Sequence, residues 1–314
     1  MRVLFWGTPD FATPALRALL GEGSDVVGVV TQPDRPRGRS RTQLEPSPVK
    51  QIALAEHLPV LQPEKPRGDE FLDAIRALDP DISVVVAYGN LLPLAVIDLP
   101  SRGTINIHAS LLPAWRGAAP IQAAIRNGDD ATGITIMRMV RKMDAGPSIL
   151  QVATPIGPEE SYGELQMRLS ELGALALIEA MAMIELDIAG EKPQDESMAT
   201  FAHKVEREHT VIDWNRSSVS VSCQIRAYDP RPGALTTLHA DEVKLYAARD
   251  VSVATDRGGS VPGTVLSVDP GGLVVACGSG AVRVSDVQPA GKRRMRAAEW
   301  GRGRGIAAGD RFGG

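Results

Sequence analysis

The chain has 314 residues, a net charge of −4 at pH 7, 43% hydrophobic residues and two cysteines, Cys223 and Cys277. These values predict a soluble globular protein in a reducing, cytoplasmic setting, and no apolar run is long enough to cross a membrane. CxxC, HExxH and Cys/His clusters are absent, which excludes the usual patterns of metal sites, so no metal is expected.

The first part of the chain alternates predicted strands and helices. Apolar runs predict strands at residues 3–6, 25–31, 59–62 and 82–88. Helical spacing predicts helices within residues 11–23, 47–57 and 68–79. This order predicts a doubly wound α/β domain with a mostly parallel sheet that binds ligands at the carboxyl ends of its strands. GxGxxG and GxxxxGK[ST] are absent, so neither NAD nor ATP is expected.

The next strand presents polar side chains among apolar ones. Residues 105–107 predict a strand, and Asn106 and His108 project from one face of it because strand side chains alternate. Residues 133–156 predict two strands joined by a loop that carries Asp144.

These three residue types suit acyl transfer. An imidazole accepts a proton near pH 7, a carboxylate fixes its tautomer and stabilises the imidazolium, and an amide donates to an oxyanion. No Ser or Cys has the setting of a nucleophile, which favours direct attack by a substrate on a bound acyl donor. A buried core histidine and a turn aspartate remain the alternatives.

The second part of the chain predicts a long helix over residues 162–190 and then a smaller domain. Polar, Pro-containing residues 191–206 predict a linker between a catalytic domain at 1–190 and a C-terminal domain at 207–314. In the latter, a helix is expected at 217–228. Five short strands, at 234–239, 242–248, 263–268, 272–277 and 280–288, predict an OB-like β-barrel.

Charge is unevenly divided between the two parts. Residues 1–203 hold 18 Lys/Arg against 26 Asp/Glu, whereas residues 204–314 hold 16 against 12. The net charges, −8 and +4, predict that the smaller domain meets a polyanion, with random surface variation as the alternative.

The chain resembles the N10-formyltetrahydrofolate-dependent formyltransferases over nearly its full length, and most closely those that act on tRNA. The likeness is carried by "NIHASLLPAWRGAAPIQAAI" (106–125), "MDAG" (143–146), "VVVAYGNLLP" (84–93), "FWGTPDFATPAL" (5–16) and "DVQPAGKRRM" (286–295). It implies an enzyme that transfers formyl from 10-formyltetrahydrofolate to the α-amino group of methionyl-initiator-tRNA for translation initiation. We expect a monomer with no membrane partner.

The resemblance also implies roles for the polar residues. Asn106 would bind the formyl oxygen, His108 would accept the amine proton, and Asp144 would polarise His108. Arg116 and Gly117 match the family's Arg-Gly, although Arg116 is equally compatible with a surface charge at a turn. Folate contacts are expected from Ser110, Leu111, Leu112, Pro113, Tyr88, Gly89 and Asn90.

Two basic segments are expected to contact the tRNA. One is an arginine-rich loop after the second strand, for which a solvated disordered loop is the alternative; the other follows the last strand and suits phosphate contact. The expected contacts are Arg35, Arg37, Arg39, Arg41, Lys292, Arg293 and Arg294. The Gly-rich end, residues 300–314, departs from the family's helical ending, and we expect it not to be fully ordered.

Other members of the family share the Asn, His and Asp set. They act on glycinamide ribonucleotide or on sugar-nucleotide amines, or form the hydrolase part of formyltetrahydrofolate dehydrogenase. The glycinamide enzyme needs no such C-terminal domain, and the basic segments favour tRNA over a sugar nucleotide. A non-enzymatic RNA-binding module is disfavoured because binding alone needs no base and carboxylate pair.

Overall fold

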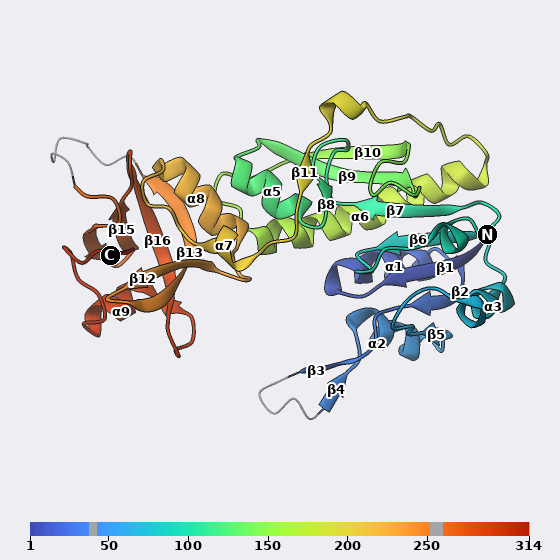
Figure 1. Cartoon of the computed structure of the whole chain (residues 1–314), viewed down its shortest axis with the longest axis horizontal. Coiled ribbons are helices and arrows are strands. Elements are labelled where there is room, and N and C mark those ends of the chain that lie inside the picture. Colours follow the sequence, from blue (N-terminus) through green and yellow to red (C-terminus); the bar gives the residue numbers. More distant parts are fainter. Residues whose placement is uncertain (38–42, 252–259, 314) are drawn as a thin grey trace. The chain divides into compact units, whose positions relative to one another are not determined.

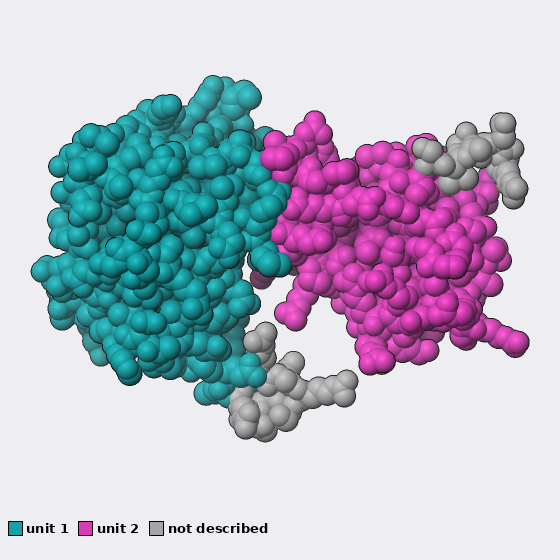
Figure 2. Space-filling view, turned by 180° about the vertical axis from the view of Figure 1, so that it is seen from behind, with its two compact units in different colours: residues 1–117, 133–154, 166–201 teal, residues 118–132, 155–165, 202–314 magenta. Residues whose placement is uncertain are grey.

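The structure is a computed structural model that describes residues 1–37, 43–251 and 260–313 and falls into two compact units (Figures 1 and 2). Unit 1 comprises residues 1–117, 133–154 and 166–201, and unit 2 comprises 118–132, 155–165 and 202–314. The predicted fold class is confirmed, with a mostly parallel sheet in unit 1 and an antiparallel sheet in unit 2. The domain limits 1–190, 191–206 and 207–314 stay predictions.

Unit 1 is built on a sheet with the strand order β10-β9-β7-β6-β1-β2-β5. The strands are β1 (Arg2–Gly7), β2 (Asp25–Val30), β5 (Val60–Leu61), β6 (Ile82–Val86), β7 (Thr104–His108), β9 (Ala131–Arg138) and β10 (Ser148–Pro155). The five strands from β5 to β7 in this order pair in parallel, and β9 runs antiparallel to β7. All five residues of β6 are buried, as its apolar composition predicts for a central strand.

Helices cover both faces of this sheet. They are α1 (Thr13–Gly21), α2 (Pro48–Ala55), α3 (Asp69–Leu78), α4 (Leu94–Ile97) and α6 (Tyr162–Glu185), with 3-10 turns η1 (Asp10–Ala12) and η2 (Glu196–Met198). On one face, Ile75 of α3 and Val96 of α4 share a core with Trp6 of β1. On the other, Gly173 lets α6 lie close to Ile107. Asn106 and His108 alternate with Ile107 and therefore project from the face opposite α6.

Two short strand pairs were not predicted from the sequence. β3 (Arg35–Arg37) pairs antiparallel with β4 (Gln43–Glu45), and β8 (Arg116–Gly117) pairs with β11 (Phe201–Ala202). The second pair brings part of the predicted linker beside the Arg-Gly motif, since the Arg116 N–H donates to Thr200 O at 2.9 Å. Strands of two or three residues are too short to show alternating hydrophobicity.

Unit 2 contains an antiparallel sheet with the order β12-β13-β16-β15-β14, and β17 pairs with β16. Its strands are β12 (Ala234–Leu238), β13 (Asp241–Val251), β14 (Val265–Asp269), β15 (Gly272–Ala276), β16 (Ala281–Pro289) and β17 (Met295–Arg296). Its helices are α5 (Pro120–Asn127), α7 (Arg207–Thr210), α8 (Ser218–Ala227) and α9 (Ala297–Arg302). α5 was not predicted from the sequence, although Pro120 begins it and the left-handed Gly128 ends it.

The Gly-rich end of the chain makes contacts within unit 2 as far as Gly313, which its composition did not predict. Phe312 is 1% exposed and stacks on Trp214 with 5.7 Å between ring centroids. The Phe312 N–H donates to Gly263 O, and the Gly313 N–H donates to Thr237 O, both at 2.9 Å. The tail thus links the β12 and β14 edges of the sheet, because one buried ring and edge hydrogen bonds outweigh the backbone freedom of the glycines.

The helices that the structure describes include none with the length and apolar composition of a membrane span.

Candidate active site

The strand β7 places Asn106 and His108 at its carboxyl end. In the sheet register, Asn106 lies opposite Val85 of β6 and Met137 of β9, and His108 lies opposite Thr135 of β9. His108 is 5% exposed, whereas Asn106 is half-buried. Ligands of doubly wound sheets bind outside the carboxyl ends of the strands, and His108 is the last residue of β7.

Two oxygens flank the His108 ring. Nε2 lies 3.0 Å from the Trp115 carbonyl oxygen, and Nδ1 lies 3.7 Å from Asp144 Oδ2. A carbonyl only accepts hydrogen bonds, so Nε2 carries the hydrogen and Nδ1 is the basic atom of the neutral ring. The Trp115 carbonyl therefore fixes the tautomer. The Asp144 carboxylate, from which this role was expected, lies 3.7 Å from Nδ1, too far for a hydrogen bond.

Burial keeps the His108 imidazole uncharged. It lowers the pKa of His108 below the ordinary value of 6.5, because an imidazolium in the interior loses its hydration. The negative charge of Asp144 and the Trp115 carbonyl act in the opposite direction without overcoming this effect. A neutral imidazole at pH 7 is the form that accepts a proton.

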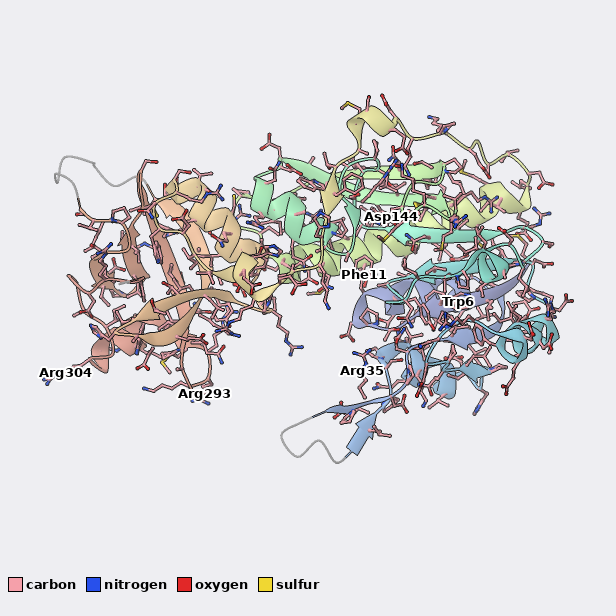
Figure 3. The ribbon with its side chains drawn as sticks, viewed as in Figure 1. Trp6, Phe11, Arg35, Asp144, Arg293 and Arg304 are labelled. Carbon is pink, nitrogen blue, oxygen red and sulfur yellow. The ribbon has the colours of Figure 1, made fainter. Side chains whose placement is uncertain are left out.

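The loop between β9 and β10 presents Asp144. This residue has a left-handed backbone (φ 51°), a conformation that Asp tolerates better than most residues. Its Oδ2 accepts a hydrogen bond from the Gly117 N–H at 2.8 Å, which aims the carboxylate at the imidazole. Figure 3 labels Asp144 beside the ends of β7 and β9.

The predicted folate segment, Ser110–Pro113, follows β7 directly. Ser110 is fully buried, and its hydroxyl donates to Ala114 O at 2.5 Å. Thr135 Oγ1 donates to Ser110 O at 2.7 Å and accepts from the Leu112 N–H at 3.1 Å. Leu111 and Pro113 are half-buried. These bonds fix the segment against β9, so the main chain next to His108 has one conformation.

The other predicted folate loop follows β6. Tyr88 is 2% exposed and packs edge-on against Trp6, with ring centroids 5.2 Å apart, so its side chain belongs to the core. Gly89 (φ 94°) and Asn90 are exposed. Burial raises the pKa of Tyr88 to about 12, which keeps its hydroxyl protonated.

The two groups of predicted RNA contacts differ in what the structure describes. Arg35 is exposed on β3, the Arg37 side chain is not described, and Arg39 and Arg41 lie outside the described residues. Lys292 and Arg293 are exposed after β16 in unit 2. Arg293 is labelled in Figure 3.

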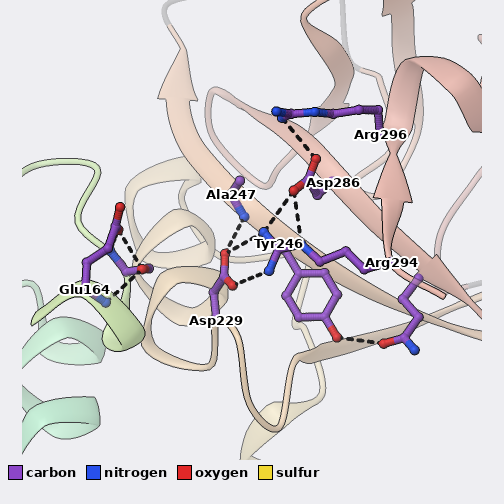
Figure 4. A network of polar contacts seen from close by, with 9 residues as sticks. Glu164, Asp229, Tyr246, Ala247, Asp286, Arg294 and Arg296 are labelled. Atoms are coloured by element: carbon purple, nitrogen blue, oxygen red, sulfur yellow. Dashed lines mark hydrogen bonds and ion pairs between the residues drawn. The ribbon is translucent and has the colours of Figure 1, made fainter. Parts of the chain in front are cut away.

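Arg294, predicted with them, has partners within unit 2. Its guanidinium pairs with Asp229 at 2.6 Å and with Asp286 at 2.9 Å, and it lies 4.3 Å over the Tyr246 ring (Figure 4). The Asp229 side chain is 8% exposed, so Arg294 neutralises a buried carboxylate. A contact of Arg294 with RNA stays a prediction.

The sequence left two alternatives for Arg116, a member of the family's Arg-Gly motif or a surface charge at a turn. The structure shows a buried side chain. Its side chain is 1% exposed and pairs with Glu196 at 3.0 Å and with Gln194. Gln194 could not be predicted as part of the site, because a single glutamine in a polar segment carries no distinguishing pattern.

The described residues contain no group of three or more His, Cys, Asp or Glu side chains arranged to hold a metal ion.

Comparisons with known proteins show which family the sequence matches. The sequence pattern of the formyl transferase family matches residues 1–181, and that of the formyl transferase C-terminal domain matches residues 204–305. Methionyl-tRNA formyltransferase from Aromatoleum aromaticum is 47% identical over 99% of this chain and 97% of its own length. Its counterpart from Bacillus subtilis is 44% identical over 99% of this chain and 98% of its own length.

A solved structure also shares the fold. HypX from Aquifex aeolicus in complex with tetrahydrofolic acid superposes with a TM-score of 0.64 at 18% identity. The match covers 95% of this chain, which spans about half of HypX (46%).

Proposed function

The chain belongs to the formyl transferase family, and we propose how its residues move the formyl group. It is an enzyme that formylates methionyl-tRNA for translation initiation, as the names of relatives at 44–47% identity over nearly the whole chain indicate. We propose 10-formyltetrahydrofolate as the donor and the α-amino group of the initiator tRNA's methionine as the acceptor.

The chemistry rests on His108, which is the observation that carries the proposal. Its Nδ1 is the free basic atom, and Asp144 Oδ2 faces that atom at 3.7 Å. When the amine nitrogen attacks the formyl carbon, a C–N bond forms and the amine proton passes to Nδ1. The resulting imidazolium then lies against a carboxylate, which stabilises it.

Asn106 stabilises the negative charge that the attack places on the formyl oxygen. The formyl oxygen becomes an oxyanion as the new bond forms, and the side-chain amide of Asn106 donates a hydrogen bond to it without changing charge. The imidazolium then returns its proton to the departing folate nitrogen as the original C–N bond breaks. The products are N-formylmethionyl-tRNA and tetrahydrofolate.

The donor and acceptor are assigned to different segments. We propose that Ser110, Leu111, Leu112, Pro113, Tyr88, Gly89 and Asn90 form the folate side of the site. The buried side chain of Tyr88 supports a role through its main chain and its packing. We propose that Arg35, Arg37, Arg39, Arg41, Lys292, Arg293 and Arg294 serve the tRNA. Among these, exposure supports Arg35, Lys292 and Arg293 for phosphate contact.

The test is transfer of radiolabelled formyl from 10-formyltetrahydrofolate to methionyl-initiator-tRNA, with glycinamide ribonucleotide as the rival acceptor. His108→Ala and Asn106→Ala are each expected to lower kcat on the order of 10²-fold while both substrates still bind. Preferential formylation of glycinamide ribonucleotide would refute the acceptor, and an unchanged kcat in His108→Ala would refute the base.

A further inference from the structure

Gln194 connects two segments that lie on either side of His108. Its side-chain oxygen accepts hydrogen bonds from Arg116 Nε at 3.0 Å and Nη2 at 2.7 Å. Its side-chain nitrogen donates to the main-chain oxygens of Asp144 at 2.9 Å and Gly146 at 2.7 Å. Arg116 stands between Trp115, whose carbonyl meets His108 Nε2, and Gly117, whose N–H meets Asp144.

We propose that Gln194 is a positioning residue of the formyl-transfer site, which holds the Asp144 loop at a fixed distance from the segment 115–117. The proposal rests on the function proposed above. Gln194 reaches neither the imidazole nor the expected path of the formyl group. It acts through the main chain of the loop, and the loop in turn sets where the Asp144 carboxylate lies relative to Nδ1.

The chemistry of its partners fixes the orientation of the Gln194 amide. A guanidinium offers only donors, and main-chain carbonyls offer only acceptors. The amide oxygen must therefore face Arg116 and the amide nitrogen must face the loop, because a flipped amide would lose all four hydrogen bonds. The amide oxygen and the amide nitrogen of Gln194 therefore both have fixed hydrogen-bond partners.

The anchor for this arrangement is a buried cation. Arg116 is 1% exposed, and Glu196 holds its remaining nitrogen, Nη1, at 3.0 Å. Removing the Gln194 oxygen would leave two donors of a buried guanidinium without this partner, so the pair is strongly favoured to stay formed. The guanidinium is therefore a rigid support for the glutamine.

The loop that Gln194 holds needs an external support. Asp144 has a left-handed backbone, while Lys142 and Met143 before it are exposed. Without the two bonds to carbonyls 144 and 146, the loop would retain fewer contacts to keep this conformation, and the carboxylate would move from its place opposite Nδ1. Small displacements of this kind impair proton transfer much more than they impair binding.

Two substitutions separate the functions of the side chain. Gln194→Met keeps the length and removes every polar atom. Gln194→Glu keeps an acceptor for Arg116 but cannot donate to the loop. Both variants are expected to lower kcat roughly 10- to 100-fold, with the KM values for methionyl-tRNA and 10-formyltetrahydrofolate changed by less than about 3-fold.

The matched control is Asp195→Ala. Asp195 is the neighbouring residue, and its carboxylate accepts hydrogen bonds from Ser197 N at 2.9 Å and Oγ at 2.7 Å without contacting the Asp144 loop in these bonds. This variant disturbs the same stretch of chain, and its kcat is expected to stay within about 2-fold of the wild type. A fall equal to that of Gln194→Met would mean that general order of the segment matters, which would overturn the proposal.

A second measurement does not depend on turnover. The imidazole of His108 can be titrated by NMR in the full chain, with its signal identified by its absence from a His108→Asn variant. In Gln194→Met the His108 pKa is expected to fall below that of the wild type, because the facing Asp144 carboxylate has moved away. The titration is read in Gln194→Met, because the new carboxylate of Gln194→Glu would itself act on the His108 pKa.

The outcomes distinguish the proposal from the function on which it rests. If the wild type fails to formylate methionyl-tRNA, the proposed function falls, while the titration still tests the contact between Gln194 and the loop. Unchanged kcat in Gln194→Glu, or a lower kcat with an unchanged His108 titration, would overturn the positioning role. If Gln194→Met does not fold, as judged by thermal melting, Gln194→Glu decides because it keeps the Arg116 pair.

Discussion

Gly146→Ala is expected to displace the Asp144 loop and impair formyl transfer without blocking substrate binding. Gly146 follows Asp144 by two residues, and its carbonyl accepts one of the Gln194 hydrogen bonds. Its φ lies outside the left-handed region, so alanine can adopt the same backbone conformation. The effect of the substitution is therefore steric.

The structure gives the size of the displacement. A Cβ atom at Gly146 would lie 1.8 Å from Arg138 O and 2.9 Å from Arg138 C, whereas real Cβ atoms stay at least 3.0 Å from such neighbours. Both neighbours are main-chain atoms of β9, which cannot rotate away, so the loop must move by roughly 1 Å or more. A misplacement of about 1 Å is worth up to about 10²-fold in rate. The crowding should also lower the free energy of unfolding by about 1–3 kcal/mol.

The assay is steady-state formylation of methionyl-tRNA together with a thermal melt. We expect kcat to fall on the order of 10²-fold and the KM for 10-formyltetrahydrofolate to change little, because the Ser110–Pro113 segment is held by Thr135 and not by this loop. Gly190→Ala is the control, since a Cβ there meets nothing within 4 Å. A Gly146→Ala enzyme with kcat within about 3-fold of wild type would refute this account of the loop.

Four further outcomes are expected. The acidic limb of kcat/KM should lie below pH 6.5, because the pKa of His108 is lowered in the folded chain, and Asp144→Asn should move that limb lower still. For the same reason the free energy of unfolding should decrease as pH falls through 6.5, because His108 is protonated in the unfolded chain at a pH where it is still neutral in the folded chain. Urea titrations at several pH values measure this decrease. Phe312→Ala should lower the free energy of unfolding of unit 2 by about 3–5 kcal/mol, and unchanged melting would contradict the ordered tail. Replacing Lys292 and Arg293 by Gln should reduce the slope of log affinity for methionyl-tRNA against log salt by about 2 without changing folate affinity, as anisotropy titrations can measure.

The sequence alone predicted the main strands and helices of unit 1, including the strand β7 that carries Asn106 and His108. Apolar runs predicted the buried strands, since a strand covered on both faces has no polar positions. Alternation then put Asn106 and His108 on one face of β7, and the strand–loop–strand pattern put Asp144 between β9 and β10. These are local properties, because each depends on residues only a few positions apart.

Tertiary structure decided how those residues are held. Gln194 meets Arg116 across 78 positions and the Asp144 loop across 50, and no periodic pattern records contacts of that separation. The same holds for the burial of Arg116 and for the packing of Phe312 on Trp214, which ordered a tail whose composition predicted disorder. Even the tautomer of His108 depends on where the chain turns back to bring the Trp115 carbonyl to Nε2. Sequence specifies which groups are available, whereas the free energy of burying and pairing them depends on neighbours that only the folded chain brings together.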